Sequence, residues 1–117
     1  WAKTVLEWNL AADPNQKPFT DGGCTACLGA VTISETVSRN PAYYIIAHAS
    51  KFVRPGSVRI ASNATMSLPN VAFKTPTGQT VLIVMNESDK PIEFNIRYKG
   101  KQSISALSAK TVATFIW

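Results

Sequence analysis

The feature that most constrains the fold is a change of hydrophobic periodicity within residues 40–60, NPAYYIIAHASKFVRPGSVRI. Asn40 suits a helix N-cap and Pro41 suits the first helical position, where no backbone N–H is needed. Apolar residues then follow at the spacing of a helix with one buried face: Ala42, Ile45, Ile46, Ala49, Phe52 and Val53. Pro55-Gly56 predicts the end of this helix, and strand-like alternation begins at Val58.

The residues after this change have the pattern of an antiparallel β-sandwich, so we expect two parts, residues 1–53 and 54–117. Strands are expected at residues 58–61, 71–75, 80–85, 92–98, 102–107 and 111–117, with turn residues between them. Residues 92–98 alternate between apolar and polar positions, which indicates one buried face. Residues 80–85 are almost entirely apolar, which predicts a central strand buried on both faces.

The composition excludes several classes of protein. Hydrophobic residues make up 45% and charged residues 16% of the 117 residues, which fits a globular domain and argues against disorder. No apolar run is long enough to span a bilayer. The net charge of +5 is spread along the sequence without the basic stripe and interleaved aromatic residues of a nucleic-acid interface, so no nucleic-acid partner is expected. Because the chain begins at Trp1, we expect it to come from a longer protein.

Residues 1–10 are predicted to form a strand that is apolar on both faces, as in a parallel sheet or barrel. Glu7, Trp8 and Asn9 lie near its C-terminal end, where side chains would face a pocket in a barrel enzyme. The residues alone favour a plainer interpretation, with Trp8 in a core and Glu7 in solvent.

Residues 11–29 are predicted to be a long loop that contains Cys24 and Cys27. A structural zinc site needs about four protein ligands, and the chain offers only one histidine besides these cysteines, so no metal and no cofactor are expected. A redox CxxC belongs at a helix N-terminus, whereas residues 28–33 have the character of a strand. We expect either a local disulfide or two plain thiols, and a disulfide would indicate an oxidising compartment.

Two further signals receive plain interpretations. Residues 30–37 are expected to form one short strand, and His48 on the helix has no nucleophile placed beside it, so it receives no catalytic role. Residues 63–65 and 86–88 fit the N-glycosylation sequon, which we interpret as chance matches unless the source is a secreting eukaryote.

Blocks of residues along the whole chain resemble a known family. The longest block is SKFVRPGSVRI at residues 50–60. Others, in order, are Trp8-Asn9-Leu10-Ala11, Gly22-Gly23-Cys24 with Cys27, Asn40-Pro41, Leu68-Pro69-Asn70-Val71-Ala72-Phe73 and Val112-Ala113-Thr114-Phe115-Ile116-Trp117. In these blocks the sequence resembles the C-terminal part of glucosylceramidase-type enzymes of glycoside hydrolase family 30.

This resemblance implies a β-sandwich preceded by a remnant of a (β/α)₈ barrel. Residues 1–10 would be the eighth barrel strand, residues 11–37 the loop and strand after it, and residues 40–53 the last barrel helix. Residues 57–117 would form most of the sandwich. Strands from the N-terminal part of the parent protein would complete it. The implied partners are the missing barrel, a β-glycoside substrate bound through that barrel, and a second copy of the fragment at an open sheet edge. For the parent, a secreted, periplasmic or lysosome-like location is favoured over the cytoplasm.

The resemblance also implies a division of chemical roles. The family hydrolyses glycosidic bonds with retention through two glutamates on earlier barrel strands, so this chain would lack both catalytic groups and be inactive alone. Trp8 is the residue that the resemblance places in the sugar pocket, because an indole fits the C–H face of a pyranose and its N–H can donate to a hydroxyl. Asn9 is a weaker substrate-binding candidate, because neighbours on a strand point to opposite faces. Glu7 would contact residues of the sugar pocket rather than the sugar itself. Phe19 and Asp21 are candidates for the rim of the pocket.

Two other hypotheses remain from the residues themselves. The first is a stand-alone sandwich module that binds a carbohydrate or a protein partner, although most aromatic residues fall at inward positions. The second is a thiol redox protein built on Cys24 and Cys27.

Overall fold

The computed structural model describes residues 4–63 and 65–117. It divides into two compact units, Trp1–Ala47 and His48–Trp117, and the division falls within helix α1 (Pro41–Phe52). The boundary expected after residue 53 stays a prediction. No helix among the described residues has the length and apolar character needed to cross a membrane.

The first unit contains a small three-stranded sheet in the order β1-β2-β3. Its strands are β1 (Ala11–Ala12), β2 (Val31–Ile33) and β3 (Val37–Arg39), with β1 parallel to β2 and β2 antiparallel to β3. The expectation of one strand over residues 30–37 is wrong, because a tight turn divides this stretch into β2 and β3. In that turn the Ser34 N–H donates to the Thr36 carbonyl at 2.9 Å.

The predicted strand over residues 1–10 is also wrong for the residues described, 4–10, which form no strand. Residues 1–3 lie outside the described part of the chain. A strand needs a neighbour for its backbone groups, and regular pairing begins only at β1, where β2 supplies one. Leu6 is 93% exposed and Leu10 is 77% exposed, so this apolar segment has little cover within the described chain.

Helix α1 covers Pro41–Phe52, close to the predicted limits, but its predicted buried face is wrong. The helix has no buried residue, and Ile45 is 60% exposed. Periodicity predicts which residues of a helix share a face, whereas burial also needs a partner surface. After the helix, Gly56 has a φ of +87°, a conformation that glycine adopts without the steric cost of a side chain.

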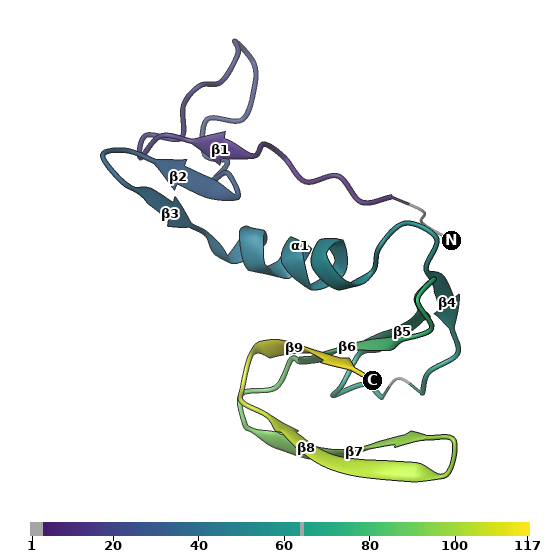
Figure 1. The fold of residues 1–117 in the computed structure, drawn as a ribbon. Helices are drawn as coiled ribbons and strands as arrows, with labels where there is room; N and C mark the ends of the chain where they lie inside the picture. The colour runs from purple at the N-terminus through teal and green to yellow at the C-terminus, as the bar shows by residue number, and fades with distance from the viewer. Residues whose placement is uncertain (1–3, 64) are drawn as a thin grey trace. The chain divides into compact units, whose positions relative to one another are not determined.

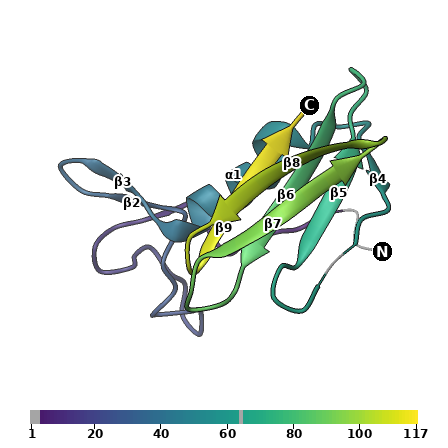
Figure 2. The same cartoon turned by 90° about the horizontal axis from the view of Figure 1, so that it is seen from below.

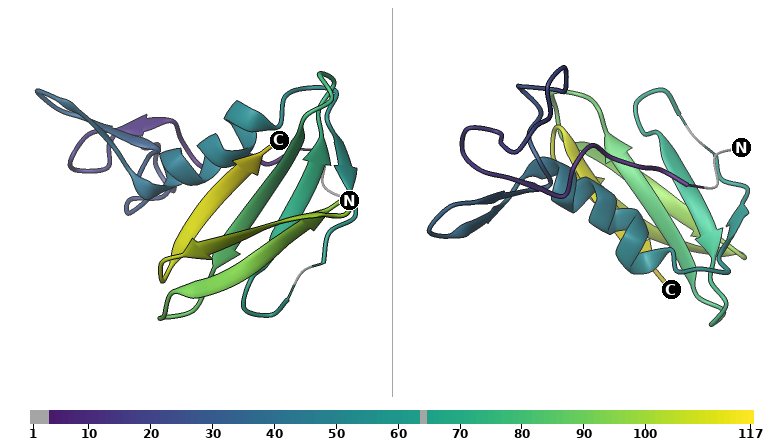
Figure 3. Two further views of the ribbon diagram at one scale, coloured as in Figure 1. Left: turned by 60° about the horizontal axis from the view of Figure 1, so that its bottom comes forward. Right: turned by 90° about the horizontal axis from the view of Figure 1, so that it is seen from above.

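The second unit is an antiparallel β-sandwich, as predicted. A four-stranded sheet in the order β4-β5-β6-β9 forms one layer, and the hairpin β7-β8 forms the other (Figures 2 and 3). The strands of the larger sheet are β4 (Val58–Ile60), β5 (Asn70–Lys74), β6 (Thr80–Asn86) and β9 (Thr111–Ile116). The hairpin strands are β7 (Ile92–Tyr98) and β8 (Lys101–Leu107) (Figure 1).

The core of the sandwich lies between these layers. Val84 of the central strand β6 faces the hairpin and is 2% exposed, whereas Val81 lies on the opposite face of the same strand and is 1% exposed, so β6 is buried on both faces as predicted. Phe94 of β7 packs edge-on against Phe115 of β9, with ring centroids 5.9 Å apart, and so joins the two sheets. Along β7 half-buried and exposed residues alternate at every position, which confirms the predicted half-buried strand.

The hairpin β7-β8 turns through two residues. Lys99 and Gly100 have φ values of +48° and +76° and connect the paired residues Tyr98 and Lys101. Two successive residues with positive φ match the twist of antiparallel strands and favour a short hairpin.

Asn86, at the end of β6, fixes the place where this hairpin leaves and rejoins the larger sheet. Its side chain is 0% exposed. Its Nδ2 lies within hydrogen-bond distance of three carbonyl oxygens, those of Lys90, Leu107 and Ser108, at 2.8, 3.2 and 2.9 Å. Its Oδ1 accepts from the Ser88 N–H and hydroxyl at 2.9 and 2.8 Å. Such a buried side chain with partners on both ends has no access for a glycan in the folded domain.

Candidate functional site

The aromatic residue expected in a sugar pocket, Trp8, lies in the extended segment before β1 and is 61% exposed. Glu7 beside it is exposed too. The indole is therefore available to a ligand, and its position depends on the backbone that follows it.

Asn9, the weaker candidate, is held tightly rather than presented to solvent. Its φ is +40°, and its carbonyl accepts from the Ala30 N–H at 3.3 Å. Its Oδ1 is buried without a hydrogen-bond partner among the described residues. A Cβ at Gly29 would lie 2.5 Å from this Oδ1 and 2.9 Å from the Ala11 carbonyl carbon. Glycine at position 29 therefore lets the segment after Trp8 approach the end of the loop.

Asn40 holds the other side of the same backbone. Its Nδ2 donates to the Gly29 carbonyl at 2.8 Å and to the Thr32 hydroxyl at 3.0 Å. Its backbone N–H donates to the Ala30 carbonyl at 2.9 Å. The structure thus joins the Trp8-Asn9 segment, the end of the loop and the start of α1 in one hydrogen-bonded arrangement.

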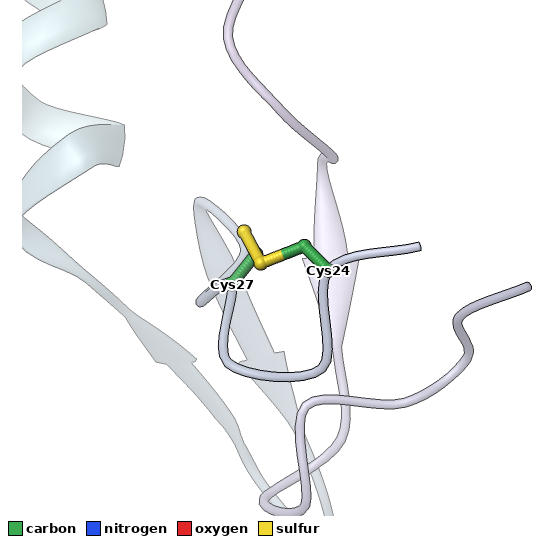
Figure 4. Close-up of a disulfide and its surroundings, with 2 residues drawn as sticks. All are labelled: Cys24 and Cys27. Atoms are coloured by element: carbon green, nitrogen blue, oxygen red, sulfur yellow. A yellow bond between two sulfur atoms is a disulfide. The ribbon is translucent and has the colours of Figure 1, made fainter. Parts of the chain in front are cut away.

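The long loop is closed locally by a disulfide between Cys24 and Cys27, whose Cα atoms are 5.5 Å apart (Figure 4). Both cysteines of the chain are used in this bond, so neither thiol is free to bind a metal. Within residues 4–63 and 65–117, no three His, Cys, Asp or Glu side chains gather into a group suited to a metal ion. Phe19 (38% exposed) and Asp21 both lie on the exposed part of this loop.

The seven acids of the chain do not form a hydrolytic pair. A general acid of the glycosidase type needs a carboxyl in apolar surroundings that keep it protonated. Six of the seven are exposed, namely Glu7, Asp21, Glu35, Glu87, Asp89 and Glu93. The seventh, Asp13, accepts from the backbone N–H groups of Asn15 and Lys17 at 2.8 Å each and so shapes a turn.

His48 has a structural partner in the second unit. Its Nδ1 lies 2.8 Å from the Thr114 hydroxyl of β9. This hydrogen bond fixes the start of the unit to its larger sheet and gives the histidine a packing role.

A second candidate site, which was not among the expectations drawn from the sequence, lies between β8 and β9. A hollow of about 540 Å³ opens there between the two layers of the sandwich, and we name it the β8–β9 groove. Its walls include Ile96, Tyr98, Ser103, Ser105, Phe115 and Trp117. Trp117 is 43% exposed, and its ring lies edge-on to Tyr98 at a centroid distance of 5.5 Å.

The phenol at the rim of this groove has an altered acidity. A hydrogen bond with Thr80 has the largest effect and lowers the pKa of Tyr98. Burial opposes this effect, and the positive charges of Lys99 and then Lys74 lower the pKa further. Lys74 also donates to the Thr80 hydroxyl at 3.3 Å.

The sequence contained a signal for this groove in the pairing register of the hairpin. Ser103 pairs with Ile96 and Ser105 with Phe94, so these serines share the inward face. Hydroxyl residues at positions expected to be apolar indicate either a solvated edge or a polar binding surface. Placing them required the register, which follows from the two-residue turn at Lys99 and Gly100.

The second unit is a two-layer antiparallel β-sandwich with an aromatic-lined groove. A family model described as the glycosyl hydrolase family 30 beta sandwich domain matches residues 56–115. The chain belongs to glycoside hydrolase family 30.

Known relatives are glycosidases that are several times longer. The endo-1,6-beta-D-glucanase neg1 of Aspergillus fumigatus is 27% identical over 99% of this chain and 26% of its own length. The lysosomal acid glucosylceramidase of Mus musculus is 28% identical over 95% of this chain and 22% of its own length. The solved structure of the endo-beta1,6-glucanase BT3312 matches with a TM-score of 0.89 and 33% identity, over 100% of this chain and 27% of that one. The chain therefore spans about a quarter of the length of these relatives.

Proposed function

We propose that this chain is the C-terminal part of a retaining β-glycosidase, with residues 1–53 contributing the last strand, loop and helix of a catalytic barrel and residues 54–117 its sandwich. The observation that carries the proposal is the match of 100% of the chain, at a TM-score of 0.89, to 27% of an endo-β1,6-glucanase. On this view the two catalytic glutamates belong to the rest of the protein, and this part supports the barrel and lines the sugar pocket.

Exposed apolar residues in the first unit support the packing of that unit on a barrel. Val5 and Leu6 are 71% and 93% exposed, and Tyr44 and Ile45 on α1 are 54% and 60% exposed. Apolar surface of this extent favours a covering partner. The seven strands and helices that precede the last pair in a (β/α)₈ barrel would supply it.

Trp8 is the residue proposed to contact the substrate. Its exposed indole offers a flat apolar face for a pyranose ring and an N–H for a hydroxyl. Gly29 and Asn40 would act as positioning residues, because they hold the backbone that follows Trp8.

The proposed substrates are β-glucosides, either glucosylceramide or a glucan with β-1,6 linkages. Relatives with each of these names match nearly the whole chain at similar identity, 28% for the glucosylceramidase and 27% for the glucanase. The choice between a lipid and a glucan aglycone requires a direct comparison, in which the protein of full length is given glucosylceramide and a linear β-1,6-glucan in turn.

The test compares the protein that carries this sequence at full length with the 117-residue chain. The longer protein is expected to hydrolyse an aryl β-glucoside and to release the β-anomer first, which NMR spectroscopy detects. The chain alone is expected to give no turnover. Trp8→Ala in the longer protein should lower kcat/KM roughly 10- to 100-fold, since binding energy at the pocket is lost, and Trp8→Phe should retain part of the rate. Hydrolysis by the isolated chain, or inversion at the anomeric carbon, would reject the proposal.

The alternative is a stand-alone module that binds a carbohydrate or a protein partner through the sandwich. The β8–β9 groove is the observation that favours it. A longer protein without any glycosidase activity, together with sugar binding by the chain, would favour this alternative.

A further inference from the structure

The inward face of β8 is polar where a sandwich needs apolar residues. Lys101, Ser103 and Ser105 pair with Tyr98, Ile96 and Phe94 of β7, so all three share the face that looks toward the larger sheet. Facing layers of a sandwich normally interdigitate apolar side chains. Small hydroxyl residues at these positions leave space between the layers, which is the β8–β9 groove of about 540 Å³.

The opposite wall of the groove is aromatic. Phe115 and Trp117 come from β9 and the residue after it, and Trp117 keeps 43% of its surface exposed. The Trp117 ring meets Tyr98 at an interplanar angle of 67°, so the two rings form a corner. A ligand in this corner would contact aromatic faces on one side and the hydroxyls of β8 on the other.

This combination matches the chemistry of a sugar. A pyranose has apolar C–H faces, which pack on aromatic rings, and a ring of hydroxyls, which need donors and acceptors. Ser103 and Ser105 supply both, and Lys99, Lys101 and Gln102 at the same groove supply donors. The volume is within the range of about 300–1,000 Å³ for small-molecule sites.

A second hollow in the sandwich, of about 490 Å³, has a different lining. It mixes apolar residues with amides, hydroxyls and Arg97, and Phe94 alone is aromatic among the described residues that line it. It therefore lacks the pair of aromatic rings on which a pyranose would pack. In the β8–β9 groove, the serines and lysine of β8 would leave polar groups unpaired against an apolar strand from the rest of the protein, which costs about 1–3 kcal/mol for each group.

We propose that the β8–β9 groove binds a short stretch of neutral β-glucan, at a site separate from the pocket of Trp8. The site goes beyond the proposed hydrolysis, because it would hold the polymer on the sandwich rather than cleave it. None of the described residues that line the groove is acidic, so the acceptors that it offers to sugar hydroxyls are the serine hydroxyls, the Gln102 amide and backbone carbonyls.

The test measures binding of linear β-1,6-glucan oligosaccharides to the 117-residue chain by isothermal titration calorimetry. Trp117→Ala should weaken binding about tenfold or more, because the aromatic contact with the sugar is lost. Ser103→Leu should weaken it by about tenfold as well, because the larger side chain fills the groove. Ala106→Leu is the matched control on the exposed, outward face of the same strand and should bind as the unaltered chain does.

Each other outcome contradicts the proposal. If circular dichroism shows that Trp117→Ala does not fold, the affinity of Ser103→Leu alone tests the proposed site. Equal affinity in Ser103→Leu and Ala106→Leu would overturn the groove as the site, and so would loss of binding in Trp8→Ala. Binding of an acidic polysaccharide without the neutral glucan would overturn the ligand. The failure of the glycosidase proposal would be seen in the hydrolysis assay alone, since this experiment needs no turnover.

Discussion

The two units of the chain differ in how much of their apolar surface is covered by the chain itself. In the second unit Val81 and Val84 are 1% and 2% exposed. In the first unit Leu6 and Leu10 are 93% and 77% exposed. Burial of an aliphatic side chain contributes about 1.5–3 kcal/mol, so the sandwich has a hydrophobic core of its own and the first unit has little of one. The comparison shows that the same kind of residue forms a buried core in the second unit and stays exposed in the first.

The sharpest test of this difference places a charge in each unit. Val81→Asp is expected to unfold the second unit, because an unpaired carboxylate in a core costs more than about 4 kcal/mol. Leu6→Asp should change the free energy of unfolding by less than about 0.5 kcal/mol. Urea denaturation monitored by tryptophan fluorescence measures both. A large loss from Leu6→Asp would show that the first unit has a core in this chain.

Asn86→Ala should have the next largest effect, a loss of about 2–4 kcal/mol, because several carbonyl and amide groups, buried or part-buried, lose their partner at once. Asn95→Ala on the exposed face of β7 is the control and should stay within about 0.5 kcal/mol. Thermal unfolding by circular dichroism compares the two variants. Equal melting temperatures would contradict the role given to Asn86.

A smaller and local effect is expected at Gly29. Gly29→Ala places a methyl group 2.5 Å from the Asn9 Oδ1, which should displace the Trp8-Asn9 segment at a cost of about 1–3 kcal/mol. Amide hydrogen exchange should increase at Ala30 and Val31, whose N–H groups bond to this segment, while the second unit stays protected. Leu28→Ala, at a site 51% exposed, is the control. Faster exchange throughout the sandwich would contradict the separation of the units.

The smallest effect concerns the rim of the groove. Thr80→Val removes the hydroxyl that lowers the pKa of Tyr98, so this pKa should rise toward the usual value of 10.0, whereas Thr80→Ser should keep it lowered. Because a lowered pKa favours the phenolate in the folded state, its contribution to stability is present above the unfolded pKa and is lost as the pH falls through the folded pKa. Ultraviolet titration of the chain between pH 8 and 12 follows the change. An unchanged titration in Thr80→Val would contradict the assigned cause.

The sandwich was predictable because its signals are local. Alternation along residues 92–98 and glycines at positions 78 and 100, both with positive φ, determine strands and turns without distant information. The helix limits followed from Pro41 and Gly56 for the same reason.

The remaining features depend on partners that a pattern does not contain. Residues 4–10 have strand character but no strand to pair with in the described chain, and Ile45 has helical spacing but no covering surface. The residues of the candidate sites also fall into those found from the sequence and those found only from the structure. Resemblance pointed to Trp8, whereas the hold of Gly29 on Asn9 and the corner of Tyr98 and Trp117 come from residues distant in the sequence.

The hydrogen bonds of the Asn86 side chain have a consequence for which parts of this domain can vary in sequence. Strands β6 and β9 pair directly, so the hairpin β7-β8 is an excursion that begins and ends beside one side chain, which bonds to Lys90 where the chain departs and to Leu107 and Ser108 where it returns. The hairpin is therefore an insertion between two paired strands. Its length and its inward-facing residues can change while the four-stranded sheet keeps its pairing. Since Ser103 and Ser105 belong to this hairpin, substitutions there can change the ligand preference of the groove without changing the four-stranded sheet.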